Sequence, residues 1–189
     1  MNTLYIDTHS NTICFVLFHD GKVIDKIENN SFFHHSSIIM PTLNQFLISN
    51  HVNIKDIHDI IVVNGPGSFT GVRLGVTIAK TLAYVLNLPI RVMSSILIQA
   101  VSNIEKGHHW FVEKEKNGYF VGEFNDLDEL LNDYIYVKKC DFNDFQATRN
   151  VIDHVELDYE RIFQFSRSLH PLNSYVVNPL YVKLIEVQK

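Results

Sequence analysis

The sequence is poor in residues that cross-link or break a chain: its 189 residues include only two cysteines, five prolines and eight glycines. Two cysteines exclude a disulfide framework and are typical of a reduced, cytoplasmic protein, and so few prolines and glycines exclude a collagen-like or low-complexity chain. A membrane span needs about 18 uninterrupted apolar residues, and Asn87, Pro89 and Arg91 interrupt the strongest candidate. With 46% hydrophobic residues, the chain should form a globular core without metal or disulfide.

An excess of positive charge is also missing. Residues 1–104 hold six acids and six Lys or Arg, whereas residues 105–189 hold fifteen acids and ten Lys or Arg, so the second part carries the whole formal charge of −5. Proteins that bind nucleic acid alone need a basic surface that displaces phosphate counterions. We therefore expect any nucleic acid to be held mainly by a partner, and we divide the chain into subdomains at 1–104 and 105–189.

The apolar pattern predicts an α/β fold. Residues 4–6, 13–18 and 23–27 read as three strands of an antiparallel meander, and residues 36–49 follow the helical period. Ser36 or Ser37 is the expected N-cap of that helix, and Pro41 predicts a kink or a late helix start. A strand at 60–63, a helix at 70–86 and a strand at 90–93 then predict a parallel crossover. Later segments are less regular, with strands expected near 110–112, 119–121 and 134–137 and short helices within 126–131 and 152–165.

Four of the eight glycines lie between positions 65 and 75. The stretch does not fit the dinucleotide fingerprint, the P-loop or the nucleophile elbow, because Thr70 replaces the third glycine, Gly-Lys-Ser/Thr is absent and Ser68 lacks flanking glycines. Small residues recur at every fourth position, which places them in one row along a helix. This row either lies on the chain's own sheet or packs against a helix of another subunit. Its members are Gly71, Gly75, Ala79 and Ala83.

The stretch Asn64-Gly65-Pro66-Gly67-Ser68-Phe69-Thr70-Gly71-Val72-Arg73-Leu74-Gly75 closely resembles the signature of the TsaB (YeaZ) family. The opening Ile6-Asp7-Thr8, His35-Ser36 with Pro41, and the terminal Pro179-Leu180-Tyr181-Val182-Lys183 are also similar to that family. The resemblance covers residues 1–100 and the C-terminal tail. It implies an actin-like, hexokinase-like (ASKHA) fold of two related subdomains, the second of them trimmed here.

The resemblance also implies a role. Members of this family are non-catalytic dimerisation subunits for threonylcarbamoyladenosine synthesis on tRNA, and they act with a larger catalytic paralogue, TsaD, and an ATPase, TsaE. We therefore expect a cytoplasmic scaffold that pairs two helices with a TsaD-like subunit and contacts tRNA only through the complex; a homodimer of the chain alone is a further alternative. The expected interface residues are His35, Ile39, Leu43, Phe46, Leu47, Gly71, Gly75, Ala79 and Ala83.

No catalytic, cofactor or metal site is expected. A nucleotide site of the actin type needs phosphate loops from both subdomains; Asp7-Thr8-His9-Ser10 could form one, but the second half has no paired glycines. Asp7 is either a relic of a nucleotide-site carboxylate or the cap of the following turn. The ten histidines are interpreted as solvated, because His34 and His35 are followed four residues on by Ile38 and Ile39. The alternative function is a degenerate actin-fold small-molecule kinase that binds ATP.

Overall fold

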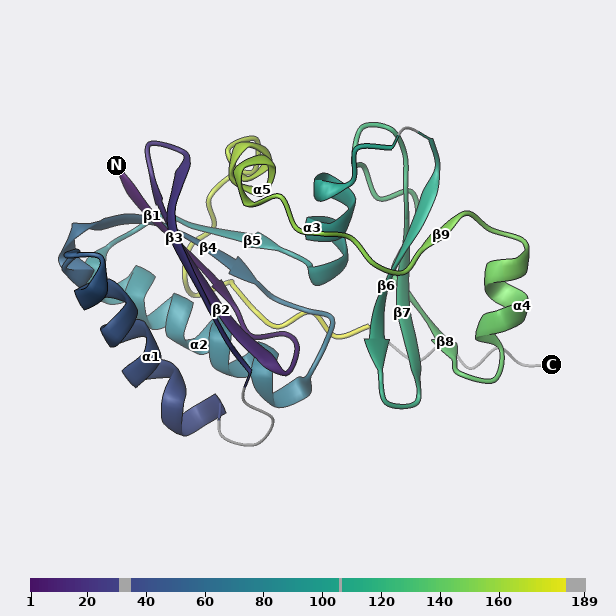
Figure 1. The fold of residues 1–189 in the computed structure, drawn as a ribbon, viewed down its shortest axis with the longest axis horizontal. Coiled ribbons are helices and arrows are strands. Elements are labelled where there is room, and N and C mark those ends of the chain that lie inside the picture. Colours follow the sequence, from purple (N-terminus) through teal and green to yellow (C-terminus); the bar gives the residue numbers. More distant parts are fainter. Residues whose placement is uncertain (31–34, 106, 183–189) are drawn as a thin grey trace.

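The computed structural model describes residues 1–30, 35–105 and 107–182 (Figure 1). These residues form two α/β halves that lie side by side, each built on its own sheet. The elements in chain order are β1 (Asn2–Asp7), β2 (Thr12–His19), β3 (Lys22–Asn30), α1 (His35–Ser49), the 3-10 turn η1 (Ile54–Asp56), β4 (Ile57–Val63), α2 (Phe69–Leu86), β5 (Ile90–Met93), α3 (Ser95–Ser102), β6 (His109–Glu115), β7 (Gly118–Phe124), β8 (Ile135–Lys138), α4 (Phe142–Ala147), β9 (Val151–Ile152) and α5 (Tyr159–Ser166).

The first sheet has five strands in the order β3-β2-β1-β4-β5. Strands β1, β2 and β3 pair antiparallel, whereas β4 pairs parallel with both β1 and β5. Helix α1 connects β3 to β4 and helix α2 connects β4 to β5. The predicted meander and the predicted parallel crossover are therefore both confirmed.

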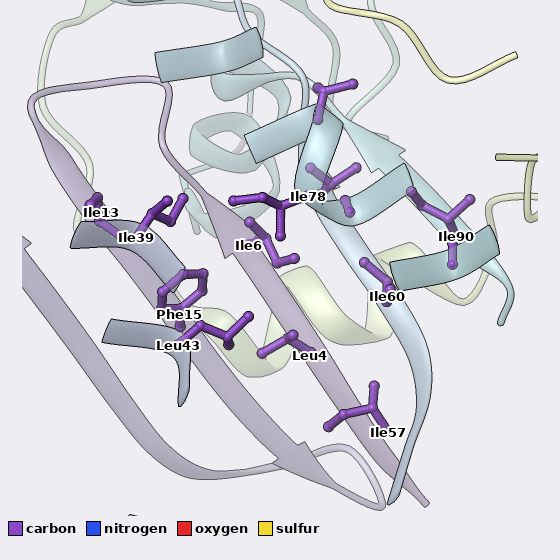
Figure 2. Close-up of a cluster of buried hydrophobic side chains, with 14 of the residues drawn as sticks. Leu4, Ile6, Ile13, Phe15, Ile39, Leu43, Ile57, Ile60, Ile78 and Ile90 are labelled. Carbon is purple, nitrogen blue, oxygen red and sulfur yellow. The ribbon is translucent and has the colours of Figure 1, made fainter. Parts of the chain in front are cut away.

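Alternation along the strands buries both faces of this sheet. Leu4 and Ile6 of β1 point toward α1 and α2, and Figure 2 shows them with Ile39 and Leu43 of α1 and Ile78 of α2. Tyr5, between Leu4 and Ile6, points to the opposite face, where residues of α3 and α5 cover the sheet. A sheet covered on both faces explains why β4 reads as a continuous run of β-branched residues.

The second sheet repeats the order of the first in a shorter form. Its strands run β8-β7-β6-β9, with an antiparallel meander of β6, β7 and β8 and with β9 parallel to β6. Helix α4 lies between β8 and β9, as α1 lies between β3 and β4. The two halves are thus related in topology, as the resemblance implied, and the second lacks a counterpart of β5 among the described residues.

Several local predictions are corrected. Helix α1 begins at His35, so it has neither a late start nor an N-cap at Ser36 or Ser37, and Pro41 lies inside it. Residues 126–131 form a turn rather than a helix, because the Asn125 side chain accepts hydrogen bonds from the backbone amides of Leu127 and Glu129. The pattern also missed α3 and α4, which are only eight and six residues long.

Segments of residues 159–180 return to the first sheet. Ile162 of α5 is buried against that sheet, and the backbone amides of Leu172 and Leu180 donate hydrogen bonds to the carbonyls of Ile90 and Asn64. These contacts join residues after 105 to the first half, so the subdomain boundary between residues 104 and 105 remains a prediction. Helix α2 is long and apolar enough to cross a membrane by length and composition, but here one of its faces packs on the sheet.

Candidate functional site

The residues predicted to form a partner interface lie inside the chain's own fold. Helix α1 directs its apolar stripe, Ile39, Leu43, Phe46 and Leu47, into the core beneath the first sheet, where each is at most 5% exposed. Ala79 and Ala83 of α2 are buried in the same cluster. His35 is the first residue of α1, and its side chain lies outside the described residues. The amphipathic period of each helix identified its sheet-facing side.

The two glycines of the row face the loop after β1. A Cβ atom on Gly71 would lie closer than 3.0 Å to the carbonyl oxygen of Thr8, and one on Gly75 would lie closer than 3.0 Å to the Thr8 hydroxyl. The Thr8 hydroxyl donates a hydrogen bond of 2.7 Å to the carbonyl of Gly71. The row therefore lets α2 approach the end of β1. This corrects the placement of Gly71 and Gly75 at a partner surface.

The outer faces of α1 and α2 lie beside one another on the same side of the sheet (Figure 1). Large apolar side chains are exposed there, namely Met40 and Ile48 on α1 and Phe69, Tyr84 and Val85 on α2. We call these five residues the outer helix surface. They occupy the helix sides that an amphipathic pattern normally reserves for polar residues, and this signal in the sequence could have identified them.

Two motifs that are distant in the sequence meet at the start of α2. The Leu180 amide donates to the Asn64 carbonyl at 2.7 Å, and the Asn64 side chain donates to the Asn178 carbonyl at 3.1 Å. Arg73 Nε donates to the Tyr181 hydroxyl at 2.6 Å, and its guanidinium lies 3.7 Å from the centre of the Phe69 ring. The C-terminal motif thus extends the outer helix surface beyond the N-terminal end of α2.

The loop after β1 holds the predicted phosphate loop, and both Asp7 carboxylate oxygens and the His9 backbone groups in it are paired. Asp7 Oδ1 accepts from the backbone amide of His9 at 3.0 Å, so Asp7 caps this turn, and Asp7 Oδ2 accepts from the Tyr5 hydroxyl at 3.1 Å. The His9 carbonyl accepts from the amide of Ser68, the N-cap of α2, at 2.6 Å. Gly67 abuts the same carbonyl.

His9 is only 12% exposed and lies between charged partners, which corrects its interpretation as a solvated histidine. Its Nδ1 lies 2.6 Å from Asp7 Oδ1, and its Nε2 lies 3.2 Å from Oε2 of Glu113 on β6. Burial lowers the pKa of the imidazole, but the two carboxylates outweigh burial and hold that pKa well above its usual value. Burial likewise raises the pKa of Asp7, and His9 reverses this to a net lowering.

The fold and these sites define a class of protein: a two-subdomain α/β protein of the actin-like, hexokinase-like type, in which helices α1 and α2 present an apolar outer surface. A solved structure of YeaZ from Pseudomonas aeruginosa has this fold, with a TM-score of 0.76 over 95% of this chain and 100% of that one, at 16% identity. The predicted fold class is therefore confirmed.

Sequence comparisons identify the family. The family model described as TsaD, tRNA N6-adenosine threonylcarbamoyltransferase, matches residues 29–110. The tRNA threonylcarbamoyladenosine biosynthesis protein TsaB of Bacillus subtilis is 32% identical over 152 residues, covering 74% of this chain and 66% of that protein. TsaB of Escherichia coli is 33% identical over 105 residues, covering 53% of this chain. The chain belongs to the TsaB (YeaZ) family, and it spans 66% and 43% of the lengths of these two relatives.

Proposed function

We propose that this chain is a cytoplasmic, non-catalytic subunit in threonylcarbamoyladenosine formation on tRNA. It would act as a scaffold for a TsaD-like catalytic subunit, together with a TsaE-like ATPase. The observation that carries the proposal is the outer helix surface on a member of the TsaB family: five large apolar side chains exposed on two adjacent helices. Removing such a surface from water is the main favourable contribution to association.

The partner contact would use the outer sides of α1 and α2 rather than their buried stripes. A stable interface of standard size needs about 800 Å² from each partner. Helices of 15 and 18 residues, extended by the Phe69, Arg73 and Tyr181 stack, would supply this contact. The same surface would pair two copies of the chain when the catalytic partner is absent.

A scaffold role agrees with the pairing in the loop after β1. A nucleotide phosphate needs free backbone amides and usually a nearby metal-binding carboxylate. Here both oxygens of Asp7 accept hydrogen bonds from Tyr5 and His9. An ATP-binding kinase is therefore the less supported alternative, and calorimetry of the isolated chain with ATP and magnesium tests it directly. Tight binding would favour the kinase.

A charge on the outer helix surface should prevent association without unfolding the chain. We expect Val85→Glu to weaken binding to the TsaD-like protein of the same organism by at least 100-fold, about 2.7 kcal/mol, because a carboxylate would be buried without a partner. The matched control is Leu127→Glu, since Val85 and Leu127 are 69% and 71% exposed but Leu127 lies in the second subdomain. Calorimetric titration measures both affinities.

The outcome for activity follows from a drop-out reconstitution. Purified TsaD-like and TsaE-like proteins, tRNA, threonylcarbamoyl-adenylate and ATP are incubated with the wild-type chain, with the Val85→Glu or Leu127→Glu variant, or with no chain, and modified adenosine is followed over several turnovers. We expect turnover only with the wild-type chain and the Leu127→Glu control. Equal turnover without the chain would contradict the scaffold role, and equal binding by both variants would contradict this surface.

A further inference from the structure

His9 lies between one carboxylate from each half of the molecule. Nδ1 is 2.6 Å from Asp7 of the first sheet and Nε2 is 3.2 Å from Glu113 of the second. A neutral imidazole carries one N–H and can donate to only one of these oxygens. Only the doubly protonated ring donates to both, so the geometry favours a charged imidazolium. The partners are 7% and 16% exposed and the ring 12%, so water screens this triad little.

Other polar and titratable groups face the triad from the neighbouring elements. From β1 the Tyr5 hydroxyl donates to Asp7, and from α3 the Gln99 amide lies 3.4 Å from the Glu113 oxygen that faces His9. Lys114 of β6 lines the hollows beside the ring. Behind Asp7 lie the thiol of Cys14 on β2 and the hydroxyl of Tyr159 on α5, 3.5 Å apart, and burial raises the pKa of both.

The triad borders two hollows between the subdomains. Their volumes are about 650 and 630 Å³, and His9, Ser10, Glu113 and Lys114 line both of them. Elsewhere the subdomains meet mainly through apolar packing of α3 against β6 and β7, including Ile96 and Phe111, and through a 2.6 Å hydrogen bond between Ser94 and Tyr134. The His9–Glu113 pair is thus an ionic contact beside an apolar one.

We propose that His9 is an ionic latch that sets the angle between the two subdomains. While the imidazolium bridges Asp7 and Glu113, the subdomains are held closed; when the ring loses its proton, one carboxylate loses its donor and the halves separate around the α3 contact. The His9 carbonyl accepts a hydrogen bond from the amide of Ser68, so movement of His9 on opening would also displace the start of α2. The latch does not depend on the proposed function.

Spin-label distances in the full chain test the latch. Cys140 is exposed in the second subdomain and Cys14 is buried, so labels are placed at the native Cys140 and at Lys55→Cys on the exposed turn before β4. Distances are measured by pulsed electron resonance from about pH 6 to about pH 10, and the His9 ring is followed by NMR. We expect one narrow distance until the ring titrates and a longer, broader distribution above that point.

Two variants separate the latch from other titrations. Glu113→Gln should lower the pH midpoint of the His9 ring and broaden the distances already near neutral pH, whereas the exposed control Glu156→Gln should change neither. His9→Gln should give a broad distribution that does not vary with pH, which excludes a contribution from Tyr5 or Tyr159. A neutral His9 ring at neutral pH, or wild-type distances that stay unchanged as the ring titrates, would overturn the proposal even if a variant fails to fold.

Discussion

Gly75→Ala should destabilise the fold even though alanine is the better helix former. The substitution adds a Cβ closer than 3.0 Å to Thr8 Oγ1, a spacing that real Cβ atoms essentially never show. Thr8 is fully buried and its hydroxyl is bonded to the Gly71 carbonyl, so it cannot turn into solvent. The clash must therefore be relieved by moving α2 away from β1 or by breaking this hydrogen bond.

The magnitude follows from two opposing terms. Overpacking of a well-packed core costs about 1–3 kcal/mol, and this contact falls at the upper end. Replacing glycine by alanine inside a helix returns about 1 kcal/mol. We expect the free energy of unfolding to fall by about 2 kcal/mol, which shifts a urea midpoint by about 1 M for a slope near 2 kcal/mol per M.

A double-mutant cycle isolates the cause. Thr8→Ala removes Oγ1, and the new Cβ at position 75 would then meet the Cβ at position 8 at an ordinary 3.5 Å. In that background Gly75→Ala should become stabilising by about 1 kcal/mol, a coupling of about 3 kcal/mol. Gly71→Ala is the matched contrast, because its clash is with the Thr8 backbone carbonyl and remains in both backgrounds. A stabilising Gly75→Ala in the wild-type background would refute this placement of the row.

Two further predictions concern buried groups. Asp59 is buried and accepts hydrogen bonds from Arg91 at 2.5 and 2.6 Å and from Arg167. Asp59→Asn should therefore lower the free energy of unfolding in urea by about 3–5 kcal/mol. Arg167→Gln changes a side chain that is 39% exposed and should lower it by only about 1 kcal/mol, so equal losses would contradict the buried pair. Burial raises the pKa of the Cys14 thiol to about 12. An aromatic disulfide reagent at about pH 8 should therefore react with Cys140 alone in the native chain and with both thiols in urea. Rapid reaction of two thiols in the native chain would contradict the burial of Cys14.

The first sheet was predictable because its signals are local and strong. Hydrophobic runs, turn residues and a long helical period identify β1 to β5 together with α1 and α2. The short elements of the second half were less predictable, since six to eight residues contain too few periods to separate a helix from a turn. Helix α3 is an example: Ser94 caps its N-terminus, and Ile96 and Ala100 pack against Phe111 of β6, but only the N-cap is visible in the local sequence.

Residues predicted to meet a partner lie in the core for a different physical reason. An apolar stripe such as Ile39, Leu43 and Phe46 reports burial, but it does not say whether the chain's own sheet or another subunit covers it. The first sheet has two apolar faces and must cover both, so the strongest stripe of each adjacent helix is used inside the subunit. A partner can then use only the weaker apolar residues left outside, such as Met40, Ile48 and Val85.

The latch was hidden from the sequence because its parts are 104 positions apart and each looks ordinary alone. Asp7 reads as a strand end, His9 as a loop residue and Glu113 as one acid in a charged run. Packing of the second sheet beside the first brings them together at the loop after β1, where the largely buried imidazole needs a donor proton on each nitrogen. Besides capping the turn, Asp7 would thus have a second structural use: it holds the charge that closes one subdomain on the other.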